Sequence, residues 1–376
     1  MAATDTVTQR PTVSVIVPAR NEECCLGSCL ESLTAQTGVA FEVIVVDDHS
    51  TDRTREIASS FPGVRVIEAG PLPAGWTGKN NAVVAGAREA RGDWLLFTDA
   101  DTVHLPGSLA RALAEAQEHG AELLSYSPEQ IVRTFWEKAV MPVIFAELAS
   151  RYRPSEVSDP NSPAAAANGQ YILITRAAYD VVGGHAALAA ELLEDVALAR
   201  AVKQSGRKIL FRYGGEAVRT RMYRNVSQLR EGWTKNLALL FPQPRRLALR
   251  VLFLWLLAWT APIVAILLSV DVLRSPVTQG LVTALSAIPL MRLIVRVHRA
   301  NFSLDAALLA MAFGPPMFAY LLRRSEWTHR NGRVGWKGRS YSPPPEIMKL
   351  TRASSSTSSE SKRELITEKP RLRTEN

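Results

Sequence analysis

Two aspartates, Asp99 and Asp101, lie just after an apolar run at residues 94–97, with one residue between them. A continuous apolar run of this length is typical of a buried parallel strand, and ligands of open α/β sheets bind beyond the carboxyl ends of the strands. Carboxylate oxygens suit hard divalent cations. The spacing therefore predicts a cation site with room for substrate phosphate oxygens. The alternative is that the two aspartates only cap the next helix.

The elements that would position these aspartates alternate between strand and helix throughout residues 12–127. Such alternation predicts an α/β fold with a mainly parallel, doubly wound sheet and right-handed crossovers. The predicted strands of this region are residues 13–18, 41–46, 64–68 and 93–98.

Charged residues gather at the ends of two more of these strands. Arg20 and Glu22 follow the first strand, and Asp47 and Asp48 follow the second. Because the carboxyl ends of parallel strands lie at one edge of a sheet, we expect these groups to meet Asp99 there. Polar loops are common in α/β proteins, but carboxylates at three strand ends call for a ligand or cation that balances their charge.

Two common phosphate-binding motifs are missing from the sequence. No Gly-x-Gly-x-x-Gly follows the first strand, and no Gly-Lys-Ser/Thr loop exists. These absences argue against dinucleotide-binding and P-loop proteins. They favour a nucleotide that is held by carboxylates at its ribose and by a cation at its diphosphate.

The motifs, taken in order, resemble those of family 2 glycosyltransferases of the GT-A fold. They are residues 15–22 (Val-Ile-Val-Pro-Ala-Arg-Asn-Glu), 46–52 (Val-Asp-Asp-His-Ser-Thr-Asp) and 99–101 (Asp-Ala-Asp). Residues 73–82 (Pro-Ala-Gly-Trp-Thr-Gly-Lys-Asn-Asn-Ala) resemble the subset that glycosylates lipids, such as carotenoid-acid and hopanoid-associated enzymes. The resemblance covers roughly residues 12–240 and implies a nucleotide-sugar-binding GT-A domain.

The resemblance implies that the ends of the first two strands bind the nucleoside of a UDP-sugar donor. Pro18, Arg20 and Glu22 would border the nucleoside. Asp48 or Asp47 would hold the uracil or the ribose.

It implies further that three charged residues surround the ribose and the diphosphate. Lys79 would approach the uracil or the diphosphate as a point charge, although a solvated lysine at a helix start is the alternative. Asp99 would face the ribose side, and Asp101 would ligate Mn²⁺ or Mg²⁺ at the diphosphate, with Asp99 beside it.

A second acidic pair, Glu194 and Asp195, begins a predicted helix that runs through residue 204. The helix dipole favours acidic residues at this position, which is the alternative explanation. In the family, the aspartate of such a pair is the catalytic base. The resemblance therefore implies that Asp195 takes the proton of an acceptor hydroxyl in a displacement that inverts the anomeric centre. Glu194 would assist it, while the cation and Lys79 stabilise the departing diphosphate.

Three further residues are candidates for the acceptor side. Gln170 belongs to another predicted strand, and His185 follows it, although a lone histidine is more often a structural, hydrogen-bonded residue. Trp233 lies in a basic, aromatic helix at residues 222–241 that suits a membrane interface. Processive family members carry Gln-x-x-Arg-Trp here. This chain keeps only the tryptophan, which favours transfer of a single sugar.

Apolar segments dominate the C-terminal third. Residues 247–270 are long and apolar enough to span a bilayer. Residues 277–297 are interrupted by Arg292 and Arg296, and residues 306–322 contain Gly-Pro-Pro, which predicts a kink or a re-entrant shape. The expected organisation is a flexible N-terminus (1–11), a catalytic domain (12–221), an interfacial helix region (222–245), a transmembrane region of two to three spans (246–323), a basic juxtamembrane segment (324–352) and a disordered tail (353–376).

The charge and the cysteines favour the cytoplasmic face of a membrane. The chain has 44 basic and 36 acidic residues, a formal charge of +8, but no nucleic-acid-binding motif. The basic residues cluster beside the apolar segments, which favours an anionic bilayer surface as partner and no nucleic acid. Cys24, Cys25 and Cys29 fall on one predicted helix and suit reduced thiols. No cleavable signal is visible, so we expect the catalytic domain to stay in the cytoplasm, at the inner membrane.

The sequence thus predicts a multi-pass, metal-assisted, inverting glycosyltransferase that moves one sugar from a UDP-sugar to a lipid hydroxyl or carboxyl group. Two alternatives remain. A polysaccharide synthase of the same fold would be expected to carry the Gln-x-x-Arg-Trp motif, which this chain lacks. A non-catalytic membrane scaffold that only binds nucleotide sugar would not need the four carboxylates of Asp48, Asp99, Asp101 and Asp195 together.

Overall fold

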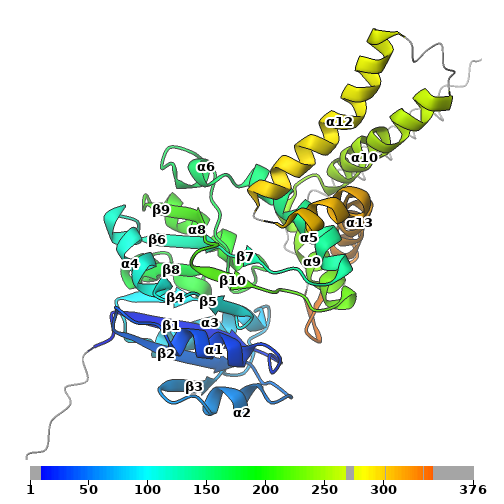
Figure 1. The fold of residues 1–376 in the computed structure, drawn as a ribbon. Coiled ribbons are helices and arrows are strands. Elements are labelled where there is room, and N and C mark those ends of the chain that lie inside the picture. Colours follow the sequence, from blue (N-terminus) through cyan, green and yellow to red (C-terminus); the bar gives the residue numbers. More distant parts are fainter. Residues whose placement is uncertain (1–9, 268–274, 301, 333, 342–376) are drawn as a thin grey trace, which may run out of the picture.

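A seven-stranded sheet lies at the centre of the α/β part of the chain, with strand order β3-β2-β1-β4-β8-β6-β9. The computed structural model describes residues 10–267, 275–300, 302–332 and 334–341 (Figure 1). The strands are β1 (Val13–Ala19), β2 (Phe41–Asp47), β3 (Val64–Glu68), β4 (Trp94–Phe97), β6 (Leu123–Ser127), β8 (Ile172–Thr175) and β9 (Ile209–Tyr213).

The sheet is parallel where the sequence predicted it and mixed beyond that point. β1 pairs in parallel with β2 and β4, and β2 pairs in parallel with β3. β8 runs antiparallel to both of its neighbours, β4 and β6. The carboxyl ends of β1, β2 and β4 therefore share one edge, as expected, and the antiparallel β8 begins at that same edge.

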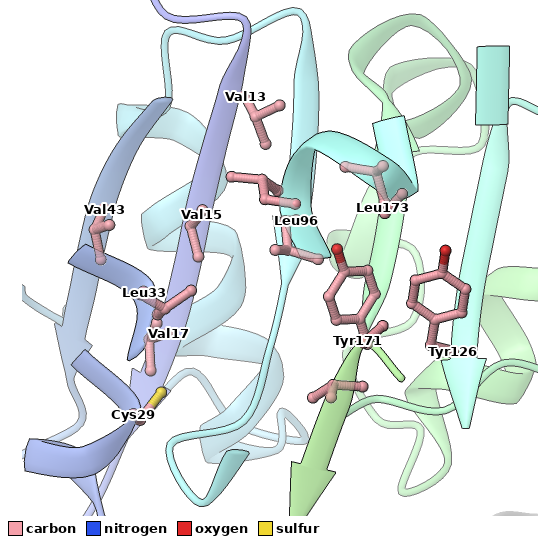
Figure 2. Packing of buried hydrophobic residues seen from close by; sticks show 14 of the residues in the cluster. Val13, Val15, Val17, Cys29, Leu33, Val43, Leu96, Tyr126, Tyr171 and Leu173 are labelled. Atoms are coloured by element: carbon pink, nitrogen blue, oxygen red, sulfur yellow. The ribbon is translucent and has the colours of Figure 1, made fainter. Parts of the chain in front are cut away.

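Helices cover both faces of the sheet because side chains alternate between its two faces. Val15 and Val17 of β1 belong to the same core cluster as Leu33 of α1 (Figure 2). Ile16 belongs to a second cluster on the opposite face, beneath α3. The helices of this part are α1 (Leu26–Thr34), α2 (Thr54–Ser59), α3 (Gly78–Glu89), α4 (Ser108–Glu118), α6 (Pro154–Ser158), α7 (Arg176–Val181) and α8 (Glu194–Gln204), with a 3-10 turn η1 (Gly184–Ala186).

The cysteines do not share one helix, which corrects the prediction. Asn21 adopts a φ of +53°, and its side-chain oxygen accepts a hydrogen bond from Thr51 N at 2.8 Å. The chain therefore turns before it becomes helical, and α1 begins only at Leu26. All three cysteines are free thiols, and Cys29 alone lies buried inside the helix.

A small sheet closes the edge beyond β4. It consists of β5 (Thr102–His104), β10 (Val218–Thr220) and β7 (Glu129–Gln130), in the order β5-β10-β7. Thr220 Oγ1 donates a hydrogen bond to the backbone oxygen of Asp101 at 3.2 Å. The turn that carries Asp101 is thus held against β10.

A third hydrophobic cluster joins the α/β part to the C-terminal helices. The elements of this region are α5 (Phe135–Arg151), α9 (Val226–Leu240), α10 (Pro244–Leu267), α12 (Pro276–Arg299), α13 (Leu304–Arg330), β11 (Val334–Trp336) and β12 (Arg339–Tyr341). α13 packs on α5 so closely that a Cβ at Gly314 would lie 2.4 Å from the backbone oxygen of Ala139. Instead of a re-entrant turn, α13 forms a single helix that contains Pro315 and Pro316.

Two helices of the described chain are long and apolar enough to cross a membrane, residues Pro276–His298 in α12 and Leu304–Arg330 in α13. The apolar stretch of α12 is 6% buried and that of α13 is 44% buried. The described residues of α10 do not meet this criterion. We expected the first span at residues 247–270, of which residues 268–270 lie outside the described part. α10 and α12 project together from the rest of the molecule (Figure 1). Residues 1–9 and 342–376, which include the predicted tail, also lie outside it.

Candidate functional site

A cleft of about 560 Å³ opens at the carboxyl ends of β1, β2 and β4. This volume lies in the range of small-molecule sites. The cleft is lined at one end by charged side chains from the strand ends and at the other by apolar side chains from α5 and α9.

The structure distinguishes between Asp47 and Asp48. Asp47 accepts a hydrogen bond from Ser50 N at 3.2 Å and holds the turn after β2. Asp48 lines the cleft, where its Oδ1 accepts a hydrogen bond from Arg339 Nη2 at 3.0 Å. Arg20 Nη1 donates to the backbone oxygen of Asp48 at 2.6 Å. Asp48 is therefore the one of the two that faces the cleft.

Pro18, Arg20 and Glu22 line the same end of the cleft, as predicted. The Glu22 carboxylate forms an ion pair with Lys337, whose Nζ also donates to the backbone oxygen of Arg20 at 3.0 Å. These contacts tie the end of β1 to a segment more than 300 residues away in the sequence.

Lys79 bridges the two acidic groups of the site. Its Nζ lies 2.8 Å from Asp99 Oδ1 and 2.8 Å from Glu194 Oε1. Burial acts to lower the pKa of Lys79, but the two carboxylates outweigh burial and raise this pKa well above its ordinary value. Thr77 caps the start of α3 through its side chain, which fixes the helix turn that carries the lysine. Lys79 is thus a paired cation of the cleft and not a solvated helix-start lysine.

Asp101 is the residue whose surroundings best fit a bound cation. Burial, with the negative charges of Asp99 and Glu22, raises the pKa of Asp101 to about 7. Its buried Oδ1 has no hydrogen-bond partner among the described residues. No group of three potential metal-ligating side chains occurs in that part of the chain. The donor set therefore fits a cation that shares Asp101 and Asp99 with oxygens of a substrate.

Glu194 and Asp195 form the first turn of α8, as predicted. Asp195 accepts hydrogen bonds from the backbone N–H groups of Gly169 at 2.9 Å and Val196 at 2.8 Å. Burial and the neighbouring Glu194 charge raise the pKa of Asp195 to about 6. This carboxyl group lines the cleft and changes its protonation state close to neutral pH, which suits proton transfer.

The three acceptor candidates differ in position. Gln170 lines the cleft, donates from Nε2 to Thr220 Oγ1 at 3.1 Å and has a buried Oε1 without a partner in the described chain. His185 is buried behind Lys79, where its Nδ1 lies 3.1 Å from the Tyr179 hydroxyl; burial lowers the pKa of His185 to about 4. Trp233 lines the cleft wall but is 2% exposed, and its indole N–H points to Met141 Sδ at 3.3 Å.

The β11–β12 hairpin reaches the charged end of the cleft and supplies residues that sequence reasoning did not assign. Lys337 and Gly338 both have positive φ, +46° and +76°, as a tight two-residue hairpin turn requires. The turn presents Lys337 to Glu22 and Arg339 to Asp48. A Cβ at Gly78 would lie 1.7 Å from Arg339 Nη1, so the guanidinium passes where only glycine leaves room. The sequence signal that could have found them is the Gly-Trp-Lys-Gly-Arg run at residues 335–339.

The opposite end of the cleft is apolar. Phe145 and Leu148 project from one face of α5, because residues spaced three apart share a helix face, and Tyr152 follows at the end of the helix. Leu240 of α9 lines the same region, and Leu193 continues this surface to the start of α8. The site thus joins a charged half to an apolar half, with Glu194 and Asp195 between them.

Comparisons with known proteins agree with this geometry. Residues 14–179 match the model of "Glycosyl transferase family 2". The 4,4'-diaponeurosporenoate glycosyltransferase of Staphylococcus aureus (strain MRSA252) is 30% identical over 88% of this chain and 88% of that protein. Among solved structures, the mannosyltransferase PcManGT from Pyrobaculum calidifontis is similar over 85% of this chain and 87% of its own, with 18% identity and a TM-score of 0.44. Residues 1–349 of S. aureus TarS are similar over 88% of this chain and 99% of that chain, with 18% identity and a TM-score of 0.43. The chain is a family 2 glycosyltransferase with the GT-A fold.

Proposed function

We propose that the protein transfers one sugar from a UDP-sugar to a hydroxyl or carboxyl group of a membrane lipid, with inversion at the anomeric carbon. The observation that carries this proposal is that one cleft holds a charged half, an apolar half and a carboxyl pair between them. The name of the S. aureus relative supports a lipid acceptor, because diaponeurosporenoate is a carotenoid acid.

In the proposed donor complex, the nucleoside lies against Pro18, Arg20 and Glu22, and Asp48 accepts a hydrogen bond from the uracil or the ribose. Asp101 and Asp99 would hold Mn²⁺ or Mg²⁺ near the diphosphate. The chemistry that such a cation supplies when bound is neutralisation of charge on the leaving group.

Two residues of the chain act on the reacting groups in this proposal. Asp195 accepts the proton of an acceptor hydroxyl as that oxygen attacks the anomeric carbon. Lys79 donates hydrogen bonds to the departing diphosphate. Glu194 keeps Lys79 in place through its 2.8 Å ion pair.

We further propose that the catalytic domain and the C-terminal end of α13 lie on the cytoplasmic side of the inner membrane. The β11–β12 hairpin follows α13 directly and pairs with Glu22 and Asp48 of the catalytic domain. The chain therefore has to cross the bilayer an even number of times before it. α12 and α13, the two helices of the described chain that are long and apolar enough to cross a membrane, satisfy this requirement as a crossing pair.

The test is UDP release by the full chain in detergent, with a panel of UDP-sugars, membrane lipid extract, and Mn²⁺ present or absent. We expect metal-dependent, lipid-stimulated release from one donor and its loss in Asp101→Asn. With water or a lipid alcohol as acceptor, Asp195→Asn should also abolish release. Donor binding without turnover, with no effect of any lipid fraction, would support the scaffold alternative instead. Successive addition of sugars to one product would support the polysaccharide synthase.

A further inference from the structure

A network of buried hydrogen bonds surrounds the turn that carries Asp99 and Asp101. Buried polar groups cost stability unless they are hydrogen-bonded, so a cluster of them needs an explanation in what it holds in place. The side chains of this network are at most 4% exposed, and they are Thr98, Thr102, His104, Gln170 and Thr220.

The two ends of the network are the backbone oxygens of the two aspartates. Thr102 Oγ1 donates a hydrogen bond to the backbone oxygen of Asp99 at 2.7 Å. Thr220 Oγ1 donates to the backbone oxygen of Asp101 at 3.2 Å. Because the direction of a side chain follows from its backbone, these two bonds also orient the carboxylates that would share a cation.

Gln170 and His104 join the two ends. Gln170 Nε2 donates to Thr220 Oγ1 at 3.1 Å, and the backbone oxygen of Gln170 accepts from Thr98 Oγ1 at 2.8 Å. The hydroxyl oxygens of Thr98 and Thr102 lie 2.9 Å apart. His104 Nε2 lies 3.1 Å from the first and 3.3 Å from the second. The turn after β4 is thus connected to the segment before β8 and to β10 by one continuous set of hydrogen bonds.

The tautomer of His104 follows from a count of the hydrogens in the network. Burial lowers the pKa of His104 to about 3, so the ring is neutral and has one N–H group. The two threonine hydroxyls have one hydrogen each, and the backbone oxygens of Gln170 and Asp99 take both. A hydrogen on Nδ1 would be a buried donor without a partner in the described chain. The ring hydrogen therefore belongs on Nε2, where the hydroxyl oxygens accept it.

We propose that Thr102 and His104 are positioning residues that set the affinity of the cation site. Thr102 holds the backbone of Asp99, and the Nε2 hydrogen of His104 leaves the Thr102 hydrogen free for that bond. Neither residue lines the cleft, so neither acts on a substrate directly. Hydrogen-bonding partners behind metal-ligating side chains orient them and tune the affinity for the metal. This inference rests on the proposed cation at Asp99 and Asp101.

The first experiment separates positioning of the cation site from general support of the fold. Titration calorimetry of the full chain in detergent measures UDP binding, once with Mn²⁺ and once with EDTA. Thr102→Val removes the hydroxyl and keeps the branched shape of the side chain. We expect UDP binding with Mn²⁺ to weaken by about 10–100-fold and UDP binding without metal to stay unchanged. Thr102→Ser keeps the hydroxyl and should restore most of the affinity.

Thr34→Val is the matched control, because Thr34 Oγ1 also donates to a backbone oxygen, that of Leu30 in α1, at 2.8 Å. It should change neither affinity. An equal loss with and without Mn²⁺ in Thr102→Val would show a structural role only and overturn the inference, as would no loss at all. Wild-type binding of UDP that does not depend on Mn²⁺ would contradict the proposed cation site itself, and this inference with it.

The second experiment tests the Nε2 hydrogen of His104. His104→Gln places an amide N–H group near the position of ring Nε2, whereas His104→Asn places it near Nδ1. Electron paramagnetic resonance of free Mn²⁺, in the presence of UDP, measures binding of the ion to each variant. We expect the glutamine variant to bind Mn²⁺ nearly as well as the wild type and the asparagine variant to bind it about 10-fold more weakly. Equal Mn²⁺ affinities of the two variants would contradict the role of His104. Unfolding midpoints verify that all variants fold.

Discussion

The two halves of the cleft are built in different ways. The charged half, our proposed donor half, consists of strand ends, and its charged side chains are fixed by ion pairs such as Lys79 to Asp99 and Arg339 to Asp48. The apolar half, our proposed acceptor half, is built on helices α5 and α9, and its lining is mostly apolar. Charged groups in fixed positions suit a small anionic donor, because charge-assisted hydrogen bonds depend on geometry. A long apolar chain is bound mainly through the apolar surface that it buries, which does not depend on direction.

The largest effect should come from Lys79→Met, which breaks the donor half. This change leaves Asp99 and Glu194 without their shared cation and removes a hydrogen-bond donor from the leaving group. We expect a loss of about 10²–10³-fold in kcat, both for lipid transfer and for hydrolysis by water. UDP release at saturating donor measures it. Arg88→Met, at an exposed position of the same helix, is the control, and an effect limited to lipid transfer would contradict the assignment.

A smaller and more selective effect should come from Leu148→Asn, which makes the acceptor half polar. Loss of one apolar contact surface should raise the KM for the lipid acceptor by about tenfold. Hydrolysis of the donor in the absence of lipid should be unchanged. Val181→Asn, at an exposed position of α7, controls for a surface polar substitution. If hydrolysis fell in parallel with lipid transfer, the effect of the apolar half would not be limited to the lipid acceptor, which would contradict the assignment.

The pH dependence of donor hydrolysis should test the role of Asp195, which lies between the two halves. Burial and Glu194 raise the pKa of Asp195 to about 6, and only the deprotonated carboxylate accepts a proton. Hydrolysis without lipid should therefore fall below pH 6, by about tenfold for each pH unit. Asp195→Asn should lose the hydrolysis together with this pH dependence. A rate that stays flat from pH 7 to pH 5 would exclude Asp195 as the base for water.

The smallest effects should come from a matched pair of glycines, one in each half. A Cβ at Gly86 would lie 2.5 Å from Ile16 Cγ2 beneath the donor half, and one at Gly314 would lie 2.4 Å from a backbone oxygen of α5. Each alanine variant should lose about 1–3 kcal/mol of stability by overpacking, measured as a lower unfolding midpoint. Gly314→Ala alone should also raise the acceptor KM, because it moves α13 away from α5. Equal acceptor KM values in the two variants would contradict this.

The sequence could predict the donor half because strand ends in a parallel sheet have a fixed relation to one another. The strands that end shortly before Glu22, Asp48 and Asp99, and the helix that begins at Glu194, all follow from local patterns. Neither the choice of Asp48 over Asp47 nor the antiparallel direction of β8 follows from such patterns, since an apolar run has no direction.

The contacts of the apolar half and of the hairpin could not be predicted, for a different reason. Arg339 reaches Asp48 across 291 residues, and no local pattern encodes such a pairing. The Gly-Trp-Lys-Gly-Arg run at residues 335–339 marks the hairpin, but it does not identify the partners of its side chains. The use of α5 as a cleft wall depends on how α9 and α13 pack on it.

The central claim is that both halves act in one transfer reaction, and movement of label from donor to lipid tests it most directly. The full chain is incubated with labelled UDP-sugars and membrane lipid extract, with and without Mn²⁺, and the lipid phase is counted. We predict that label from one donor enters the lipid phase only with metal, and that Asp101→Asn prevents it. Label that stays with UDP or appears only as free sugar, whatever lipid is supplied, would contradict the account.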